Sequence, residues 1–244
     1  MNRRALCVGI NAYRTSPLQG CVNDARDWAA ELAGRGYDVD LLLDGFATKA
    51  TLLERLAVLA AGARWGDRLV FTYSGHGTFV PDRDGDEPDR RDEALVSVDM
   101  RTVTDDELHN TVGRIPRGVR LTIVSDSCHS GTMARFVAAN APAHYTAAPR
   151  FLDPAHVVAE PTVKPRSLPA RAMLLSGCAD DEVSYDAYIG GRYRGAMTAA
   201  ALEALPAATS MRDWHRRTLA ALRYPQTPQL DATPYQRYRL RPFA

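Results

Sequence analysis

The amino-acid sequence predicts one α/β domain in which a doubly wound, mostly parallel sheet carries helices on both faces. Short apolar runs of strand length alternate with longer stretches in which apolar residues recur at helical spacing. Strands separated by helices of this length form βαβ units, which build parallel sheets. The chain has 244 residues, 45% of them hydrophobic and 24% charged, so it can bury a large core without disulfides.

The first half of the chain holds three predicted strands and two predicted helices in alternation. The strands are expected at residues 5–10, 37–43 and 68–73, and the helices at 23–35 and 48–63. In the first helix Trp28 and Leu32 fall on one helical face, and Gly34 and Gly36 are typical stop signals.

The second half continues the alternation but contains two long interruptions. Strands are expected at 119–124 and 172–176, and helices at 196–205 and 211–222. Thr104 and Glu107 have the spacing of a capping box, which predicts the start of a short helix. Residues 81–93 form a dense charged loop, and residues 140–169, rich in proline and alanine, are too long for an ordinary connection and predict a functional loop.

Charge and cysteine usage exclude several classes of protein. The net charge is +1 without a basic stripe, so nucleic acid is not an expected partner. The N-terminus is too short in apolar length for a signal peptide, and no apolar run could cross a membrane, so we expect a cytoplasmic protein without a membrane partner. The four cysteines form no CxxC pair, which argues against zinc and fits reduced thiols.

Two predicted strands end in unusual sequences. The strand at 119–124 runs into SDSCHSG, which presents Cys128 where a helix could begin, and the strand at 68–73 runs into SGHGT, which presents His76. The carboxyl ends of neighbouring parallel strands meet at one edge of the sheet, where ligands bind. We therefore expect His76 and Cys128 to face each other at that edge.

This pair has the chemistry of a cysteine nucleophile. A thiol is mostly protonated at neutral pH, and a nearby imidazole can take its proton or, as a cation, stabilise the thiolate. Acyl transfer also needs donors for the developing oxyanion, and the backbone N–H groups of Gly77 and Cys128 are the candidates. The sequence thus predicts a His76–Cys128 catalytic dyad with an oxyanion hole.

Other interpretations of the same residues remain open at this point. A cysteine after a strand is commonly a small buried hydrophobic residue, which is the interpretation for Cys7 and Cys178. A thiol redox sensor would need a resolving cysteine near Cys128. None lies close in sequence, although Cys21 could be close in space.

The chain resembles a caspase-fold cysteine peptidase, most closely the metacaspase branch with its bacterial members. YSGHGT is similar to the family's histidine motif and DSCHSG to its cysteine motif, and the separation of 52 residues from His76 to Cys128 fits the caspase spacing. LQGCVNDARDWAAEL, SGCADDEVSYDA and PQLDATP extend the resemblance over nearly the whole chain. It implies one caspase-like domain, with a large-subunit-like portion at 1–139, a linker loop at 140–170 and a small-subunit-like portion at 171–244.

The resemblance also implies a substrate class. The caspase motif Gln-Ala-Cys is replaced by Asp-Ser-Cys, and metacaspases, unlike caspases, cleave after arginine or lysine. On the matching positions Asp24 and Asp126 would line an acidic pocket, with Ser74 nearby. Two carboxylates in such a pocket attract a guanidinium. Asp24 could equally cap the following helix, and Asp126 could be a strand-end turn residue.

Calcium is a second implication of the resemblance. Many metacaspases are activated by calcium, and their ligands resemble Asp92, Asp105 and Asp106 of this chain. An aspartate that the family often has seven positions after the catalytic cysteine is here Arg135, which puts calcium dependence in doubt. The other interpretation of the acidic loop at 81–93 is a solvated charged surface.

Self-cleavage is a third implication. The candidate sites are the basic residues of the long loop and its end: Arg150, Lys164, Arg166 and Arg171. That loop could also be a simple connection. We expect protein or peptide substrates with basic residues, no organic cofactor and a monomer. The alternative function is an interaction or effector module of the same fold that stays inactive until a partner gates it.

Overall fold

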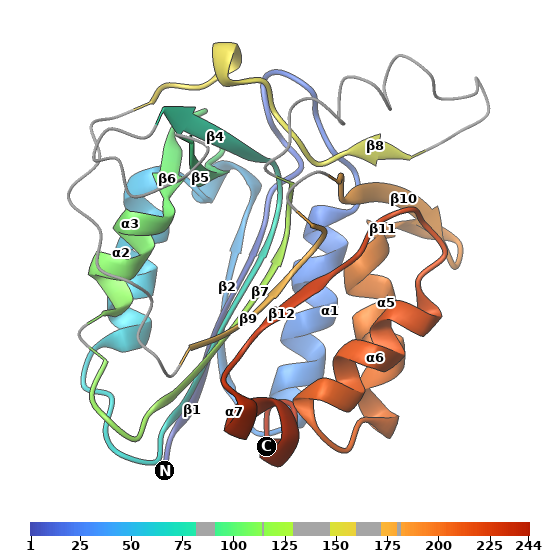
Figure 1. Cartoon of the computed structure of the whole chain (residues 1–244). Helices are drawn as coiled ribbons and strands as arrows, with labels where there is room; N and C mark the ends of the chain where they lie inside the picture. Colours follow the sequence, from blue (N-terminus) through green and yellow to red (C-terminus); the bar gives the residue numbers. More distant parts are fainter. Residues whose placement is uncertain (82–90, 114, 129–146, 160–171, 180–181) are drawn as a thin grey trace.

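The centre of the molecule is a six-stranded sheet with strand order β12-β9-β7-β3-β1-β2 (Figure 1). The computed structural model describes residues 1–81, 91–113, 115–128, 147–159, 172–179 and 182–244. Five strands run parallel: β1 (Arg3–Gly9), β2 (Asp38–Leu43), β3 (Arg68–Ser74), β7 (Arg120–Asp126) and β9 (Ala172–Ser176). The edge strand β12 (Gln229–Asp231) pairs antiparallel with β9. The predicted mostly parallel sheet is confirmed.

Helices cover both faces of this sheet. On one side lie α1 (Cys21–Gly34), α5 (Ala196–Ala204) and α6 (Met211–Ala221), and on the other lie α2 (Lys49–Ala60) and α3 (Asp105–Val112) (Figure 1). A short α7 (Pro234–Arg239) lies near the chain ends. Central strands such as β3 and β7 are buried almost throughout, as strands covered on both faces must be. No helix in the described residues is both long and apolar enough to cross a membrane.

Local sequence signals account for the helix ends. The predicted capping box is present, since the Thr104 side chain accepts from the Glu107 N–H and the Glu107 side chain accepts from the Thr104 N–H. α1 begins at Cys21, two residues before the predicted start. Its N-cap is Gly20, and the side chain of Asn11, from the loop after β1, accepts the Cys21 N–H at 2.9 Å. A cap supplied from another element leaves no local sequence signal.

Two small antiparallel sheets were not predicted. One has order β4-β5-β6, formed by β4 (Gly77–Pro81), β5 (Arg91–Val96) and β6 (Thr102–Thr104). The other has order β11-β10-β8, formed by β8 (Ala148–Pro149), β10 (Tyr185–Ile189) and β11 (Arg192–Gly195). Short 3-10 turns occur at Asp44–Phe46, Pro154–His156 and Leu205–Ala207.

These sheets correct two loop predictions. The expected loop at 81–93 begins at the end of β4 and ends inside β5, and the expected loop at 140–169 contains β8 and the turn Pro154–His156. Strands of two to six residues carry too little periodicity to be recognised, and their pairing depends on partners far away in the sequence.

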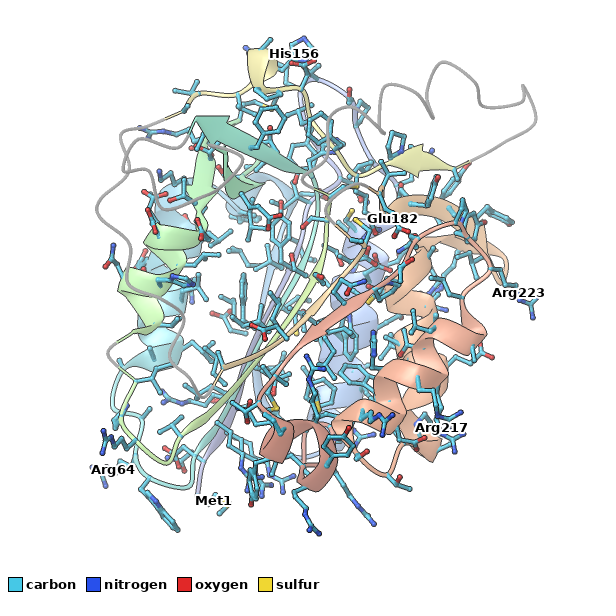
Figure 2. The ribbon with its side chains drawn as sticks, in the orientation of Figure 1. Met1, Arg64, His156, Glu182, Arg217 and Arg223 are labelled. Carbon is cyan, nitrogen blue, oxygen red and sulfur yellow. The ribbon has the colours of Figure 1, made fainter. Side chains whose placement is uncertain are left out.

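An aromatic cluster fixes the helices of the α1 side. The rings of Trp28, Trp214 and Phe243 lie 5.4 to 6.3 Å apart in edge-on contacts. Trp214 also donates its indole N–H to the Ala201 carbonyl at 2.8 Å, which ties α6 to α5. The outer side of α6 is polar, and there Arg217 pairs with Asp213 (Figure 2).

Truncating the cluster should destabilise the whole domain. We expect Trp214→Ala to lower the free energy of unfolding by about 3 to 5 kcal/mol, because a fully buried ring and its hydrogen bond are lost. Trp65 is 81% exposed, so Trp65→Ala is the matched control, with a change within about 0.5 kcal/mol. Urea unfolding followed by circular dichroism measures both, and equal losses would contradict this account of the core.

Candidate active site

The two strand-end motifs meet at one edge of the sheet. β3 and β7 are directly paired, and their last residues, Ser74 and Asp126, are register partners. His76 and Cys128 each follow two residues later. Both are buried, at 1% and 0% exposure. The expected neighbourhood of the two motifs is therefore present in the fold.

The imidazole of His76 is held in one orientation. Its Nε2 lies 2.7 Å from the backbone carbonyl oxygen of Ser16, and its ring packs against Tyr13 with 4.6 Å between centroids. Ser16 has a φ of 56°, a left-handed backbone that aims this carbonyl at the ring. An acceptor at Nε2 keeps the proton there in the neutral ring and leaves the Nδ1 lone pair for the site.

Burial keeps this imidazole neutral. It lowers the pKa of His76 from 6.5 to about 4, and the Ser16 carbonyl, which stabilises the charged form of the ring, opposes that shift only in part. A neutral imidazole can accept a proton. Two roles are expected for His76, and a neutral ring fits the general base better than the imidazolium partner of a thiolate.

Cys128 lies against the turn that leads into β10. Its sulfur accepts the Ser184 N–H at 2.8 Å, and its thiol faces the Ser184 carbonyl oxygen at 3.4 Å. Cys178 lies in the same small buried cluster as Cys128. The nucleophile candidate is thus held by backbone groups of the C-terminal portion of the chain.

An arginine side chain occupies the space beside the two motifs. Arg150 is completely buried, and its guanidinium is surrounded by three carboxylates. Nη2 lies 2.6 Å from Asp24 and 3.0 Å from Asp186, and Nη1 lies 3.3 Å from Asp126. Asp24 and Asp126, the two residues expected to line an acidic pocket, thus surround this guanidinium together with Asp186.

Each carboxylate is oriented by groups of the surrounding chain. Asp24 accepts the Gly195 N–H at 3.0 Å, Asp126 accepts the Thr198 hydroxyl at 2.7 Å, and Asp186 accepts the Gly20 N–H at 2.9 Å. Asp24 lies inside the first turn of α1 and its side chain turns to the pocket, so the helix-cap interpretation is wrong.

Three carboxylates around one cation leave an excess of negative charge. Burial raises the pKa of Asp24 from 3.8 to about 7, although the Arg150 guanidinium beside it pulls the value down. Asp126 adds repulsion in the same direction. The pocket therefore favours a fixed cation strongly.

The backbone of Arg150 is held as firmly as its side chain. Its carbonyl oxygen accepts both the Gly77 N–H at 2.9 Å and the Cys128 N–H at 3.3 Å, and its own N–H donates to the Ser184 carbonyl at 2.9 Å. These acceptor contacts use the two N–H groups expected to form the oxyanion hole.

The flanking residues of Arg150 extend along the same site. Before it, β8 pairs antiparallel with β10. After it, Phe151 stacks against Phe79 at 6.2 Å, and Leu152 donates its N–H to Gly77 and is buried in the main core at 1% exposure. The chain thus crosses the site from β8 through a bend at Arg150 to an isolated bridge between Phe151 and Gly77.

Sequence reasoning found part of this site and missed part. His76, Cys128, Gly77, Asp24 and Asp126 were expected, and Ser74 ends β3 beside Asp126. Three contributors were missed: Ser16, Ser184 and Asp186. Asp186 lies in the segment SGCADDEVSYDA, which is one of the segments that carry the family resemblance. That resemblance was the one signal in the sequence that pointed to Asp186. The self-cleavage candidates Lys164, Arg166 and Arg171 lie outside the described residues.

The structure describes only part of the calcium-ligand set that the resemblance implies. Asp105 and Asp106 lie at the start of α3, and their carboxylates and the His109 ring offer ligand atoms within 4.8 Å of one another. Asp92 lies in β5 with its side chain outside the described part, and Arg135 is also outside it. Two carboxylates suit calcium, but an imidazole nitrogen does not, so the described set fits this ion incompletely.

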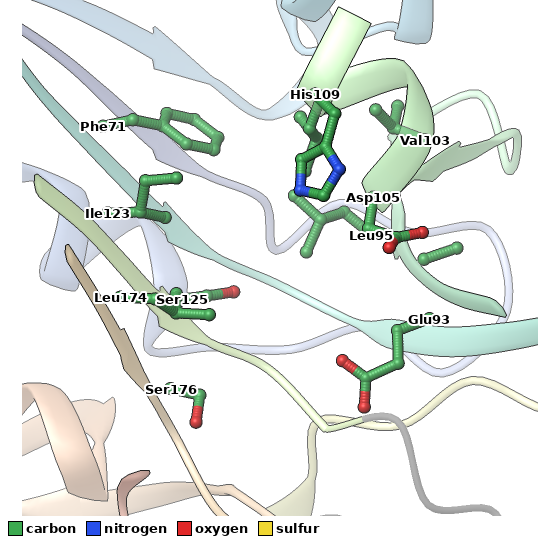
Figure 3. Close-up of a pocket in the computed structure, with 12 residues that line it drawn as sticks. Phe71, Glu93, Leu95, Val103, Asp105, His109, Ile123, Ser125, Leu174 and Ser176 are labelled. Carbon is green, nitrogen blue, oxygen red and sulfur yellow. The ribbon is translucent and has the colours of Figure 1, made fainter. Parts of the chain in front are cut away.

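A separate pocket opens on the α3 side of the sheet (Figure 3). Phe71, Leu95 and Ile123 give it apolar walls, and Asp105 and His109 lie at its rim. As outlined by the described residues it does not include His76 or Cys128. It is therefore distinct from the Arg150 site.

The chain is similar in sequence to several known proteins. The family model "Metacaspase, peptidase C14 domain" matches residues 3–136. Metacaspase-1 of Cryptococcus neoformans is 43% identical over 145 residues, which cover 53% of this chain and 32% of that protein. Metacaspase-1A of Aspergillus niger is 31% identical, with 95% of this chain and 70% of that protein covered. The chain thus spans only part of the length of these relatives, about a third of the first and 70% of the second.

Solved structures give the same fold. A crystal structure of a protein from Geobacter sulfurreducens superposes with a TM-score of 0.81 at 30% identity, covering 100% of this chain and 98% of that one. Caspase-1 of Spodoptera frugiperda superposes with a TM-score of 0.63 at 12% identity, over 95% of this chain and 86% of that one. The second likeness concerns the fold alone.

The state of His76 can be measured directly. We expect its ring to stay neutral until the pH falls to about 4, because burial penalises the charged form. Ring ¹⁵N chemical shifts of a Cys128→Ala chain would give the midpoint, with His76→Gln, made in that same chain, to assign the signal. In urea the midpoint should return to about 6.5. A folded midpoint above 6 would contradict the buried, neutral ring.

Proposed function

This chain belongs to the metacaspase family of caspase-fold cysteine peptidases, and from that premise we propose that it is an endopeptidase that cleaves after arginine, and more slowly after lysine, with His76 and Cys128 as its catalytic dyad. One observation carries the proposal. Arg150 has its guanidinium among three carboxylates while its carbonyl accepts the N–H groups of Gly77 and Cys128. A peptide substrate with arginine before the scissile bond would make the same contacts.

The dyad chemistry follows from this arrangement. His76 takes the Cys128 proton on Nδ1, and the thiolate attacks the carbonyl carbon of the arginine residue. The two N–H groups already on that carbonyl stabilise the oxyanion. The imidazolium then gives its proton to the leaving amine, and water hydrolyses the acyl-enzyme with His76 again as base. For the attack, the sulfur must leave its contact with Ser184.

The pocket supports a preference for arginine over lysine. The two terminal nitrogens of the guanidinium bind different carboxylates, Nη1 that of Asp126 and Nη2 those of Asp24 and Asp186. A planar guanidinium can contact all three at once, whereas an ammonium is a point charge on a shorter reach. Lysine would therefore leave part of the buried negative charge unpaired.

We further propose that the chain cuts itself between Arg150 and Phe151. Among the four candidate sites, Arg150 is the one that lies in the described part of the chain, and its peptide carbonyl is already on the proposed oxyanion donors. Until it leaves, Arg150 also excludes other substrates from the pocket. The alternative of a module that a partner must activate finds no support in these contacts.

The proposed reaction uses no organic cofactor. Calcium is tested only as one condition of the peptide assay below, because two of the three implied ligands, Asp105 and Asp106, have their carboxylates close together. No step of the proposed reaction passes through a metal ion.

Self-cleavage should produce one defined new end. On incubation, we expect the wild-type chain to give a fragment whose N-terminal sequence starts at Phe151, because the preceding carbonyl lies on the proposed oxyanion donors. Cys128→Ala and Arg150→Ala should stay uncut at this bond. Intact-mass measurement and N-terminal sequencing report the cut.

A matched triple variant separates Arg150 from the other candidates. Lys164, Arg166 and Arg171, all changed to Ala, should leave the cut before Phe151 at its wild-type rate. If the wild-type chain is instead cut after one of those three residues and the triple variant stays intact, the buried Arg150 is a structural ion pair and not a bound cleavage site.

Peptide hydrolysis tests the specificity. We expect cleavage of a fluorogenic arginine peptide, slower cleavage of the lysine peptide and none of the aspartate peptide, all abolished by Cys128→Ala. Asp186→Asn should lower kcat/KM for the arginine peptide by about 10- to 100-fold, because one charged hydrogen bond is lost.

Two controls accompany that assay. Asp27→Asn changes a carboxylate on α1 that pairs with Arg192 at 2.6 Å outside the pocket, and it should leave kcat/KM unchanged. Each substrate is measured with calcium and with a chelator, which reports any calcium requirement separately. Cleavage of the aspartate peptide would overturn the pocket assignment.

A further inference from the structure

We propose that Cys178 is a resolving cysteine: on oxidation by a hydroperoxide, Cys128 forms a reversible disulfide with Cys178. The disulfide itself depends on the placement of the two thiols alone. The further statement that it switches the peptidase off rests on the proposed role of Cys128 as nucleophile. The starting point is that Cys178 was expected to be an ordinary buried residue, yet it shares a small buried cluster with Cys128, and its thiol faces the carbonyl oxygen of the residue that precedes Cys128.

Neighbouring strands bring the two cysteines together. β7 and β9 are parallel partners, with Ser125 opposite Ser176, and the cysteines follow these residues by three and two positions. The Cys178 sulfur lies 3.8 Å from the carbonyl oxygen of Ser127, the residue that precedes Cys128. This contact places the second thiol at the backbone of the nucleophile candidate.

Both sulfurs are fixed on the same turn. Cys128 is held by the N–H and the carbonyl of Ser184, and Cys178 faces the carbonyl of Glu182 at 3.6 Å. The Glu182 side chain anchors that turn by accepting the Thr227 hydroxyl at 2.7 Å (Figure 2). One turn therefore holds both thiols on the same side of the site.

The other two cysteines occupy different environments. All four cysteines are free thiols. Cys7 lies on β1 in the core beneath α1, and burial raises the pKa of its thiol to about 12. Cys21 begins α1 and belongs to the core cluster on the opposite side of the sheet, whereas Cys128 and Cys178 share a third cluster with Phe151 and Val183. The described contacts therefore select Cys178, not Cys21, as the partner of Cys128.

The proposed chemistry balances with a hydroperoxide as the oxidant. The Cys128 thiolate attacks the peroxide O–O bond, forming a sulfenic acid and releasing water or an alcohol. The Cys178 sulfur then attacks the Cys128 sulfur, the S–O bond breaks, and the hydroxyl leaves as water with the Cys178 proton. Two thiols lose one electron each to the peroxide, and a dithiol reductant reverses the change.

The protonation of Cys178 in the reduced protein fits its proposed role as the resolving cysteine, with Cys128 as the thiol that reacts first. The neighbouring Cys128 thiol, together with burial, raises the pKa of Cys178 well above its ordinary value. Cys178 therefore stays a protonated hydrogen-bond donor and leaves the nucleophilic role to Cys128. Once Cys128 is oxidised, a partner thiol is already in place, which protects Cys128 from irreversible oxidation to the sulfinic acid.

The test uses the position of the proposed cut between the two cysteines. Self-cleaved wild-type protein is treated with hydrogen peroxide, alkylated, and run on a denaturing gel without reductant. We expect the two fragments to migrate as one linked species, and peptide mass spectrometry to find Cys128 joined to Cys178. Uncut protein gives the same linked peptide, so this measurement does not depend on peptidase activity.

Variants complete the test. In Cys178→Ser a hydroxyl donor remains but no disulfide can form, so peroxide should abolish arginine-peptide hydrolysis permanently, whereas wild type recovers its starting rate in dithiothreitol. Cys7→Ser is the matched control and should recover like wild type. Absence of the linked peptide in oxidised wild type, or full recovery of Cys178→Ser, would overturn the proposal. If no arginine peptide is cleaved at all, the linked peptide alone decides it.

Discussion

The buried ion pair between Arg150 and the three carboxylates is the interaction on which the rest of the site depends. Asp24, Asp126 and Asp186 come from α1, β7 and β10, so one guanidinium joins three elements that are far apart in the sequence. Burying such charges is costly, and the cost is offset only while the cation and the backbone donors are in place. The same contact holds the adjacent peptide across the ends of β3 and β7. Pocket and reaction centre are thus ordered together.

This arrangement divides the site between two parts of the chain. The parallel strands β3 and β7 supply His76 and Cys128, which is the part that the sheet alone would position. The C-terminal portion supplies Asp186 and the turn that holds both sulfurs. A metacaspase site of this kind is complete only when the C-terminal portion packs against the strands. Any opening of that contact would disturb the pocket, the nucleophile and the proposed disulfide at once.

The sequence was most informative where local patterns decide the structure. The parallel strands and covering helices follow from apolar periodicity, and the meeting of the histidine and cysteine motifs follows from the pairing of β3 with β7. Asp186, Ser16 and Cys178 could not be assigned, because their roles depend on contacts between distant segments. Nor could Arg150 be separated from the other basic residues of its loop, since only the pairing of β8 with β10 brings it to the pocket.

The burial of Leu152 has a consequence for the energetics of self-cleavage. This side chain lies in the main core two positions after Arg150, so the amine released by the proposed cut stays anchored beside the acyl-enzyme. A tethered amine has a high effective concentration, far above that of a peptide product that diffuses away. Religation then competes with hydrolysis until the new Arg150 carboxylate leaves the pocket. Withdrawal of that arginine, and not bond breaking, would therefore set the time at which the enzyme becomes available to other substrates.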